Sequence, residues 1–291
     1  MKRINHLQGM LVPAVCLLII TSCQKQVQKD VLANKETLSA TEKIIMPNFS
    51  NSITSSVARA NAQDYNTFYG PAVQMGNGHA RSWINISRAD NKPLAIGIEL
   101  TAKSMDGLPQ DPMDMAASTF VLPLHQKAAA VTPFDHITIN WNPHGHEPEH
   151  IYDVPHFDLH FYKISLDQQM SITGVPGAAP PAGYLPASYV IQGATVPQMG
   201  THWLDPHSPE LPPTMAPFTY TMIYGSNNGE VIFIEPMITR SFLLSGTAVS
   251  KEFPQPIHFA PSNTYYPSAY SIWTNTSNER IYVSLNDFVW R

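Results

Sequence analysis

Charged side chains are scarce in this chain of 291 residues. Lys and Arg number 17, Asp and Glu number 22, and together they make up 13% of the sequence, with a net charge of −5. That share is about half of the one found in ordinary soluble proteins. Disordered chains, coiled coils and nucleic-acid-binding proteins need many more charges, so the composition excludes these classes and predicts no nucleic-acid partner.

Cysteine is almost absent as well. The two cysteines, Cys16 and Cys23, lie near the start of the chain, so the rest of the sequence has no thiol for a disulfide or a cysteine nucleophile. The sequence also lacks a Gly-x-Ser-x-Gly elbow, a phosphate-binding glycine loop and a dinucleotide-binding fingerprint. The fold must therefore rest on a packed core, and none of these three catalytic signatures is available.

The first residues have the pattern of an export signal and lack the hydrophobic run of a membrane span. Lys2 and Arg3 precede the apolar stretch Met10–Ile20, which is too short for a membrane-spanning helix of roughly 20 residues. The stretch ends in Ile20-Thr-Ser-Cys23, which resembles the lipobox of bacterial lipoproteins. In that family the cysteine is acylated and becomes the first residue after cleavage.

We therefore expect residues 1–22 to be a lipoprotein signal peptide and Cys23 to carry a lipid anchor. The protein would then be extracytoplasmic, held in the cell envelope with the membrane as its partner through the anchor. An ordinary cleaved signal with an unrelated cysteine, or an uncleaved anchor, is the alternative. Residues 23–63 are polar with few large apolar side chains, which predicts a flexible tether that buries little surface.

Residues 64–291 have the texture of one β-rich domain. The chain has 26 prolines and 15 glycines, which interrupt helical patterns, and 12 Phe, 12 Tyr and 5 Trp, which favour strands. Apolar or alternating runs predict strands at Ala80–Ile86, Leu94–Leu100, Phe120–Leu124, Ile137–Trp141, Phe157–Ile164, Phe218–Tyr224, Val231–Ile238, Arg280–Leu285 and Phe288–Trp290. The turn-like Asp90–Pro93 and Gly225–Gly229 predict hairpins between the strands on either side of them, and Pro123 predicts an edge position for its strand. Ser165–Ile172 and Asp111–Ser118 are the predicted short helices. We expect a mainly β fold, a single antiparallel β-sandwich or distorted barrel with long Pro-rich loops.

Histidine is concentrated in one short segment. The chain has 12 histidines, and five of them fall within His144–His160. They are His144, His146, His150, His156 and His160, with Asp158 and other acids between them. Imidazole and carboxylate groups at short spacing are the ligands of divalent Zn, Fe, Mn or Cu. The segment therefore predicts a divalent-metal site on a long loop and the strand that follows it.

Geometry limits which histidines can share one ion. Phe157, Leu159 and Phe161 alternate with His156, Asp158 and His160, which predicts a strand with one apolar and one polar face. On a regular strand His156 and His160 lie about 13 Å apart and cannot both bind one ion without a bulge or bend. A helix with a His-x-x-x-His zinc motif is excluded by the alternation and by the position of Asp158.

Distant residues could complete the site. His202 lies in a Gly-containing loop, and Glu235 is an acid between apolar residues that needs a partner if it is buried. We expect His144, His146, His156, Asp158, His160 and His202 to converge on one side of the domain. The alternative is that the cluster is a hydrogen-bond network that stiffens a loop, without any metal.

Several stretches together resemble an uncharacterised domain family that is named after a Thermus thermophilus protein, the TTHB-type domain. The stretches are Trp141–Pro148, Pro155–Tyr162, Met199–Trp203 and Glu235–Met237, with Arg81–Trp83, Pro93–Gly97 and Gly107–Pro109 in the N-terminal part. The resemblance covers roughly residues 65–290 and implies no established reaction. Two hypotheses therefore stay open: a metal-dependent enzyme that acts on a small extracellular substrate, and a non-catalytic binding or structural lipoprotein.

Overall fold

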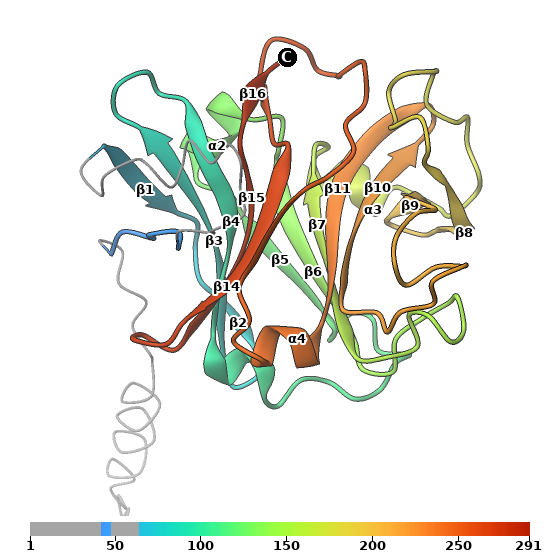
Figure 1. Ribbon diagram of the computed structural model, residues 1–291, viewed down its shortest axis with the longest axis horizontal. Coiled ribbons are helices and arrows are strands. Elements are labelled where there is room, and N and C mark those ends of the chain that lie inside the picture. Colours follow the sequence, from blue (N-terminus) through green and yellow to red (C-terminus); the bar gives the residue numbers. More distant parts are fainter. Residues whose placement is uncertain (1–41, 48–63) are drawn as a thin grey trace, which may run out of the picture. The chain divides into compact units, whose positions relative to one another are not determined.

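The computed structural model describes residues 42–47 and 64–291 (Figure 1). The predicted signal peptide, the lipidation site Cys23 and most of the predicted tether lie outside these ranges. Within the described ranges, no helix combines the length and the apolar character that crossing a bilayer requires.

Two seven-stranded antiparallel sheets form the domain, so the predicted mainly β, sandwich-like fold is confirmed (Figure 1). The first sheet consists of β1 (Tyr65–Tyr69), β2 (Val73–Met75), β3 (Gly78–Ser87), β4 (Pro93–Thr101), β12 (Val249–Glu252), β14 (Ala269–Asn275) and β15 (Arg280–Asn286). The second sheet consists of β5 (Thr119–Pro123), β6 (His136–Asn142), β7 (His156–Tyr162), β8 (Val190–Val196), β9 (Gly200–Leu204), β10 (Tyr220–Asn227) and β11 (Glu230–Thr239).

The strand order explains how distant segments meet. The first sheet has the order β1-β3-β4-β15-β14-β12, with β2 also paired to β3, and the second has the order β5-β6-β7-β11-β10-β9-β8. The predicted hairpins at β3–β4 and β10–β11 are present, and β5, which contains Pro123, is an edge strand as expected. The C-terminal strand is divided, because β16 (Val289–Trp290) leaves the sheet and pairs with β13 (Tyr265–Tyr266).

The core lies between the two sheets. Isoleucines and leucines of β3, β4 and β15 contact Ile137, Ile139, Phe157, Leu159 and Phe161 of the second sheet. The last three are fully or almost fully buried, and they are the apolar half of the alternation in β7. The core therefore fixes which face of β7 turns outward, and His156, Asp158 and His160 must lie on the outer face of the second sheet.

The helices are short. The helix predicted after β7 is present as α3 (Leu166–Met170), which begins after Ser165 with a reciprocal capping box to Gln168. The helix predicted at Asp111–Ser118 is wrong: this segment forms turns, held by the Asp111 and Asp114 side chains bonding to backbone N–H groups. Three short helical segments were not predicted: η1 (Ala102–Met105), α2 (Gln126–Val131) and α4 (Arg240–Leu244).

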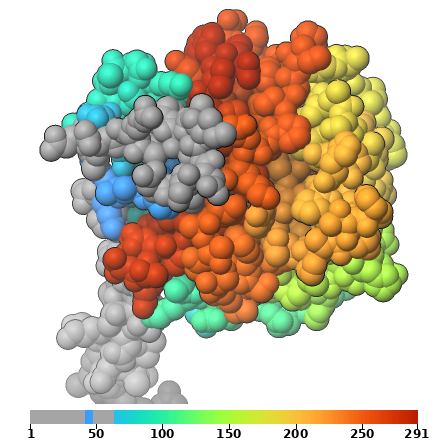
Figure 2. Space-filling view, in the orientation of Figure 1, coloured from blue at the N-terminus to red at the C-terminus, as the bar shows by residue number. Residues whose placement is uncertain are grey.

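Residues 42–47 differ from the expectation of a tether that buries little surface. Ile44 is 3% exposed and packs with Trp83, Trp273 and Tyr282 on the outer face of the first sheet. Its carbonyl accepts hydrogen bonds from Tyr65 Oη at 2.9 Å and from Asn85 Nδ2 at 3.0 Å. Figure 2 shows this bright blue segment beside the orange-red C-terminal part of the chain. Asn278 Nδ2 in that part donates a hydrogen bond to Glu42 Oε1.

Candidate metal centre

Strand β7 brings three of the predicted ligands to one buried surface. His156 and His160 are fully buried and Asp158 is 5% exposed, all on the outer face of the second sheet. The neighbouring strand β6 contributes polar side chains in register, because Asn140 pairs with Asp158 and Asn142 pairs with His156. The predicted alternation is confirmed, and polar residues on two adjacent strands form a continuous strip.

Strands β11 and β9 supply the other side of the strip. Strand β11 pairs with β7 so that Ile234 lies opposite Phe161 and Met237 lies opposite Asp158. This register places Glu235 beside His160. His202 on β9 pairs with Gly225 of β10. A Cβ at Gly225 would meet the Phe233 ring at 1.9 Å, so only glycine leaves room for that ring. The Phe233 ring packs in turn against His202, with the two ring centroids 5.3 Å apart.

The loop between β6 and β7 folds back over the strip, as the sequence predicts. Tyr152 is fully buried and packs in a small cluster with Phe218 and Met237. The backbone N–H of His146 donates to the Tyr152 carbonyl at 3.1 Å, which closes the loop on itself. Gly145 adopts a φ of 73°, and a Cβ there would meet the Tyr152 carbonyl oxygen at 2.0 Å. Glycine therefore allows the close backbone contact that turns His146 inward.

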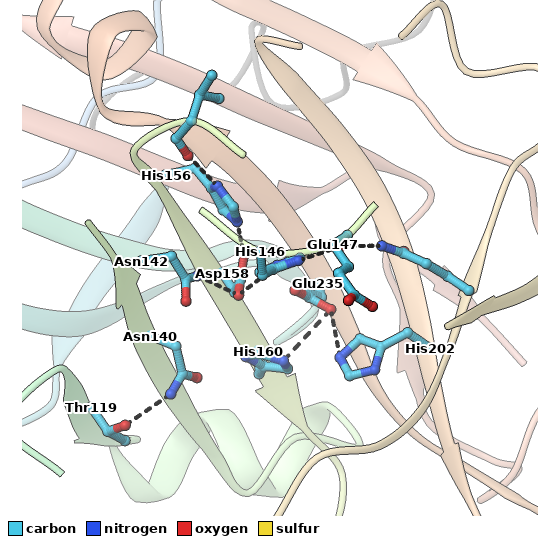
Figure 3. Close-up of polar contacts among 12 residues, drawn as sticks. Thr119, Asn140, Asn142, His146, Glu147, His156, Asp158, His160, His202 and Glu235 are labelled. Atoms are coloured by element: carbon cyan, nitrogen blue, oxygen red, sulfur yellow. Dashed lines mark hydrogen bonds and ion pairs between the residues drawn. The ribbon is translucent and has the colours of Figure 1, made fainter. Parts of the chain in front are cut away.

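His146, His156 and Asp158 form the first of two ligand groups, which we name the Asp158 group. His156 Nε2 lies 3.2 Å from Asp158 Oδ1, and His146 Nε2 lies 3.5 Å from Asp158 Oδ2 (Figure 3). On the far side of each ring, Nδ1 is 2.7 Å from a carbonyl oxygen, that of Val154 for His156 and that of Glu147 for His146. A carbonyl can only accept, so both Nδ1 atoms carry a hydrogen.

Whenever an imidazole of this group is neutral, the arrangement leaves acceptors facing acceptors. With the hydrogen on Nδ1, each neutral imidazole presents the lone pair of Nε2 to a carboxylate oxygen. His156 Nε2 and Asp158 Oδ1 are buried and have no hydrogen-bond partner. Only a proton or a metal cation between them makes the contact favourable. An N–H bonded to a backbone carbonyl, with the other ring nitrogen turned to the ion, is the usual arrangement of a metal-binding histidine.

His160, His202 and Glu235 form the second set, the Glu235 group. His160 Nε2 and His202 Nε2 each lie 3.6 Å from the same atom, Glu235 Oε2 (Figure 3). Glu235 is 1% exposed, and neither its Oε2 nor the two ring nitrogens of His160 has a hydrogen-bond partner. Buried polar atoms are almost always bonded in native proteins, so these atoms would need a proton, a water or an ion between them.

The spacing of the ligand atoms fits a small cation. Within each group the ligand atoms lie within 4.8 Å of one another, and the four nitrogen–oxygen distances given above run from 3.2 to 3.6 Å. Zinc holds nitrogen and oxygen ligands at about 2.0–2.1 Å, which in tetrahedral geometry sets them about 3.3 Å apart. Hydrogen bonds from an imidazole to a carboxylate are shorter, at about 2.7–2.9 Å. The separations are compatible with two ligands of one ion.

Burial sets the charge state of the histidines of the Glu235 group. Desolvation lowers the pKa of His160 to about 3 and that of His202 to about 4, so both rings are neutral and available as ligands near pH 7. Burial, with the nearby Asp158 carboxylate, holds the pKa of Glu235 well above its usual range. These two histidines have no proton to lose before they bind an ion.

The Asp158 group behaves differently. Burial alone would lower the pKa of His146, but the Asp158 carboxylate and the Glu147 carbonyl together raise it to about 9. Burial opposes ionisation of Asp158, but His156 and His146 hold the pKa of that carboxyl well below its usual range. Without an ion, a proton on His146 compensates the Asp158 charge, so a proton and a metal compete for this group.

Both groups face one pocket of about 820 Å³. Its walls combine apolar side chains, among them Met115, Met199 and Met237, with the amides of Asn140, Asn142 and Gln192. Four lining residues are acids, namely Glu147, Glu149, Asp158 and Glu235, and the lining contains no lysine or arginine. The volume suits a small-molecule ligand, and the charge of the walls suits cations.

Asn140 presents a free acceptor in this pocket. The Thr119 hydroxyl donates to the Met115 carbonyl at 2.7 Å, so its oxygen must accept the 2.9 Å bond from Asn140 Nδ2. This chain of bonds fixes the orientation of the amide and leaves Oδ1 buried without a partner. Asn140 is therefore oriented to accept a hydrogen bond from a ligand or a bound water.

The structure brings together five of the six predicted ligands. His146, His156, Asp158, His160 and His202 all belong to one of the two groups, whereas His144 is exposed and belongs to neither. The tight turn at Gly145 directs its neighbour His146, and not His144, into a ligand group. His156 and His160 fall in different groups, as expected for a regular strand. Their role as metal ligands stays a prediction.

The predicted ligand set lacked Glu235, Asn140 and Asn142. Glu235 had a signal, an acid between Ile234 and Pro236 on an apolar strand, but the sequence does not show that β11 lies beside β7. Asn142 donates to Asp158 Oδ2 at 2.8 Å and so holds that carboxylate. The alternation of Thr138, Asn140 and Asn142 with apolar residues is the signal that identifies both asparagines.

The comparison with protein families gives one match. The sequence model of the family described as "TTHB210-like: Hypothetical protein TTHB210" matches residues 89–141, from the β3–β4 turn to the end of β6. The resemblance to the TTHB-type domain is confirmed over that part, which ends before the histidine-rich loop. No curated protein and no solved structure matches the chain. The structure is therefore that of a β domain with two His-carboxylate groups, of which residues 89–141 are similar to this family.

Proposed function

We propose that this protein binds a divalent metal ion in the outer-face pocket and presents it to a small ligand. The observation that supports this most directly is the pair of orphaned atoms, His156 Nε2 and Asp158 Oδ1, which face each other 3.2 Å apart in a fully buried position. The Nδ1–H of His156 is already used by the Val154 carbonyl, so a cation is the simplest partner that satisfies both atoms.

The donor set selects the class of ion. Each group offers two imidazoles and one carboxylate, which suit Zn, Fe, Mn or Cu, whereas Mg and Ca prefer oxygen ligands alone. Three protein ligands leave at least one coordination position open toward the pocket, which is typical of catalytic metal sites, while structural sites are closed. The pocket geometry therefore favours a metal-dependent enzyme over a structural metal site.

A metal-free hydrogen-bond network is the second candidate. The bond from Asn142 to Asp158 and the proton affinity of His146 favour it, because both compensate the buried carboxylate without an ion. This network accounts for the Asp158 group only. It leaves both nitrogens of His160 and Glu235 Oε2 without a partner.

Elemental analysis tests the proposal. Full-length protein purified from metal-replete medium, and protein stripped and titrated with Zn(II), Mn(II), Fe(II) or Cu(II), should retain at least one equivalent of one ion after dialysis. His156→Ala should lower retention, and His144→Ala is the matched control from the same segment. If the wild type and both variants are metal-free after reloading, the network is correct. A broad activity screen of loaded and stripped protein then searches for turnover.

We also propose that the domain is lipid-anchored and extracytoplasmic. The support is the segment that ends at Cys23, which has the export-signal and lipobox pattern. Labelled fatty acid should be incorporated into the wild type, and Cys23→Ala should abolish labelling and release the protein from the membrane fraction. Cys16→Ala is the control, since this cysteine lies inside the apolar stretch. Equal labelling of the wild type and Cys23→Ala would contradict the proposal.

A further inference from the structure

The Asp158 group and the Glu235 group share no residue. Each contains two histidines and one carboxylate, and each is complete as a three-ligand set. The ligand atoms of one group lie within 4.8 Å of one another, but the six atoms do not form a single set by that measure. Opposite ligands of one octahedral ion are only about 4.2–4.4 Å apart at ordinary metal–ligand distances, so one ion does not use all six.

The two groups are nevertheless neighbours. Asp158 and His160 are two residues apart on the same face of β7, which corresponds to about 6.6 Å along a strand. On the adjacent strand β11, Glu235 lies beside His160, and Met237 pairs with Asp158. His146 and Asp158 of one group and His202 and Glu235 of the other line the same pocket. Figure 3 shows the groups side by side, with His146 between Asp158 and Glu235.

The pocket offers a buried carboxyl group to each of two divalent cations. Its lining contains the carboxylates of Glu147, Glu149, Asp158 and Glu235 and no lysine or arginine. Asp158 and Glu235 are 5% and 1% exposed, so solvent screens their mutual repulsion poorly. A single ion in either group would leave the other group's carboxyl and its two imidazoles without an ion to hold.

From these observations we infer that the pocket binds two divalent transition-metal ions side by side, one in each group. The inference rests on the proposed function and makes it more specific. The class of ion is the same in both positions, because the donor sets are alike: two imidazoles with Asp158 in one, two with Glu235 in the other. A small ligand in the pocket would then contact two ions at once, as substrates do in two-metal sites.

Metal stoichiometry tests the inference on the full-length protein. Equilibrium dialysis against Zn(II), followed by elemental analysis, should give two ions per chain for the wild type. His146→Ala should bind one ion, His202→Ala should bind one ion, and the double variant should bind none. Both side chains are partly exposed, at 38% and 13%, so their removal leaves the core intact. Circular dichroism confirms that each variant is folded.

Matched controls and second variants keep the outcomes distinct. His144→Ala and His207→Ala remove exposed histidines outside both groups and should retain two ions. Asp158→Asn and Glu235→Gln keep side-chain volume and should each lower the stoichiometry from two to one. A wild-type value of one, abolished by variants of a single group, overturns the inference but leaves the proposed function. A value of zero overturns both, and a loss in the controls assigns the ions to the surface.

Proximity has its own measurement. Protein loaded with two equivalents of Mn(II) should give an electron paramagnetic resonance spectrum broadened by interaction between the ions. His146→Ala and His202→Ala, each loaded with one equivalent, should give the spectrum of isolated Mn(II). A wild-type spectrum equal to the sum of the two single-site spectra would show that the ions are far apart, and would overturn their placement side by side.

Discussion

Each sheet buries a charged cluster on its outer face, and the two clusters differ in how their atoms are satisfied. On the first sheet, Arg81 Nε lies 2.7 Å from Glu99 Oε2, and Arg280 Nε lies 3.4 Å from Glu99 Oε1. The Arg81 guanidinium also stacks on the ring of Tyr69, 3.7 Å from its centroid. Donors face acceptors throughout, and the cluster is complete without any further group.

The cluster on the second sheet has the opposite arrangement. The Nε2 atoms of His156 and His160 face the oxygens of Asp158 and Glu235, and several of these atoms have no partner. Both clusters are buried, so burial alone does not separate a structural ion pair from a binding site. The pairing of donors with acceptors does, because every charged donor of the first cluster faces an acceptor, whereas the second cluster contains several buried atoms without a hydrogen-bond partner.

Removing one carboxylate from each cluster gives the largest expected contrast. Glu99→Gln leaves Arg81 buried without a counter-charge, and we expect a loss of about 3–5 kcal/mol in the free energy of unfolding. Glu235→Gln replaces a buried carboxyl group, whose pKa burial raises, with a neutral amide of the same size, so the stability of the metal-free protein should be unchanged within about 1 kcal/mol or should rise. Urea denaturation in the presence of a chelator measures both variants.

One result would contradict the expected difference between Glu99→Gln and Glu235→Gln. If Glu235→Gln destabilises the metal-free protein as strongly as Glu99→Gln does, then Glu235 already has a complete set of partners. The Glu235 group would then be a structural network like that of Glu99.

Metal should stabilise the protein only through the second cluster. At a free concentration of 100 times Kd, a ligand that binds the folded state alone adds about 2.7 kcal/mol. For a domain of this size each bound ion therefore corresponds to a rise in Tm of roughly 5–10 °C. The wild type and the folded variant Arg280→Lys should show the rise, since Arg280 belongs to the first cluster. The double variant His146→Ala/His202→Ala should show none in a thermal-shift titration.

The sequence predicted those parts of the fold that depend on local pattern. The alternation in Phe157–Phe161, the Asn228-Gly229 turn and the Pro123 edge strand appear as expected, because strand period and turn chemistry are local properties. The helix predicted at Asp111–Ser118 was wrong because local side-chain bonds compete with a helix: its aspartates accept hydrogen bonds from the nearby backbone and stabilise turns. Strand order is a non-local property, so the local sequence pattern did not predict that β7 pairs with β11.

In the candidate site, too, the sequence predicted what depends on local pattern and missed what depends on strand order. His146, His156, Asp158 and His160 were predictable because one loop and one strand carry them. Their assignment to two groups depends on Glu235, which reaches His160 only through the pairing of β7 with β11. The exposure of His144 depends on the φ of 73° at Gly145, which the composition of the loop does not reveal.

Different segments cover the outer faces of the two sheets, residues 42–47 on the first and the β6–β7 loop on the second. Truncation of Ile44 tests how much the first segment contributes to stability. Its side chain packs on Trp83 and Trp273 over the outer face of the first sheet, and it is 3% exposed. Ile44→Ala should cost about 2 kcal/mol, the low end for such a truncation, because a peripheral segment can shift to fill the space. Ile45→Ala, at a neighbouring side chain that is 64% exposed, is the control and should change little in urea denaturation.

The cover of the second sheet is tested by the smallest change, Tyr152→Phe. The Tyr152 hydroxyl donates to Glu210 Oε1 at 3.1 Å beneath the loop, while its ring packs on Phe218. Losing the hydroxyl removes one hydrogen bond to a charged group but keeps the ring, so we expect a loss of about 1–2 kcal/mol. Because the loop carries His146, the variant should also bind metal more weakly, whereas Ile44→Ala on the other face should not. Weakened binding in Ile44→Ala but not in Tyr152→Phe would show that the β6–β7 loop does not position the site.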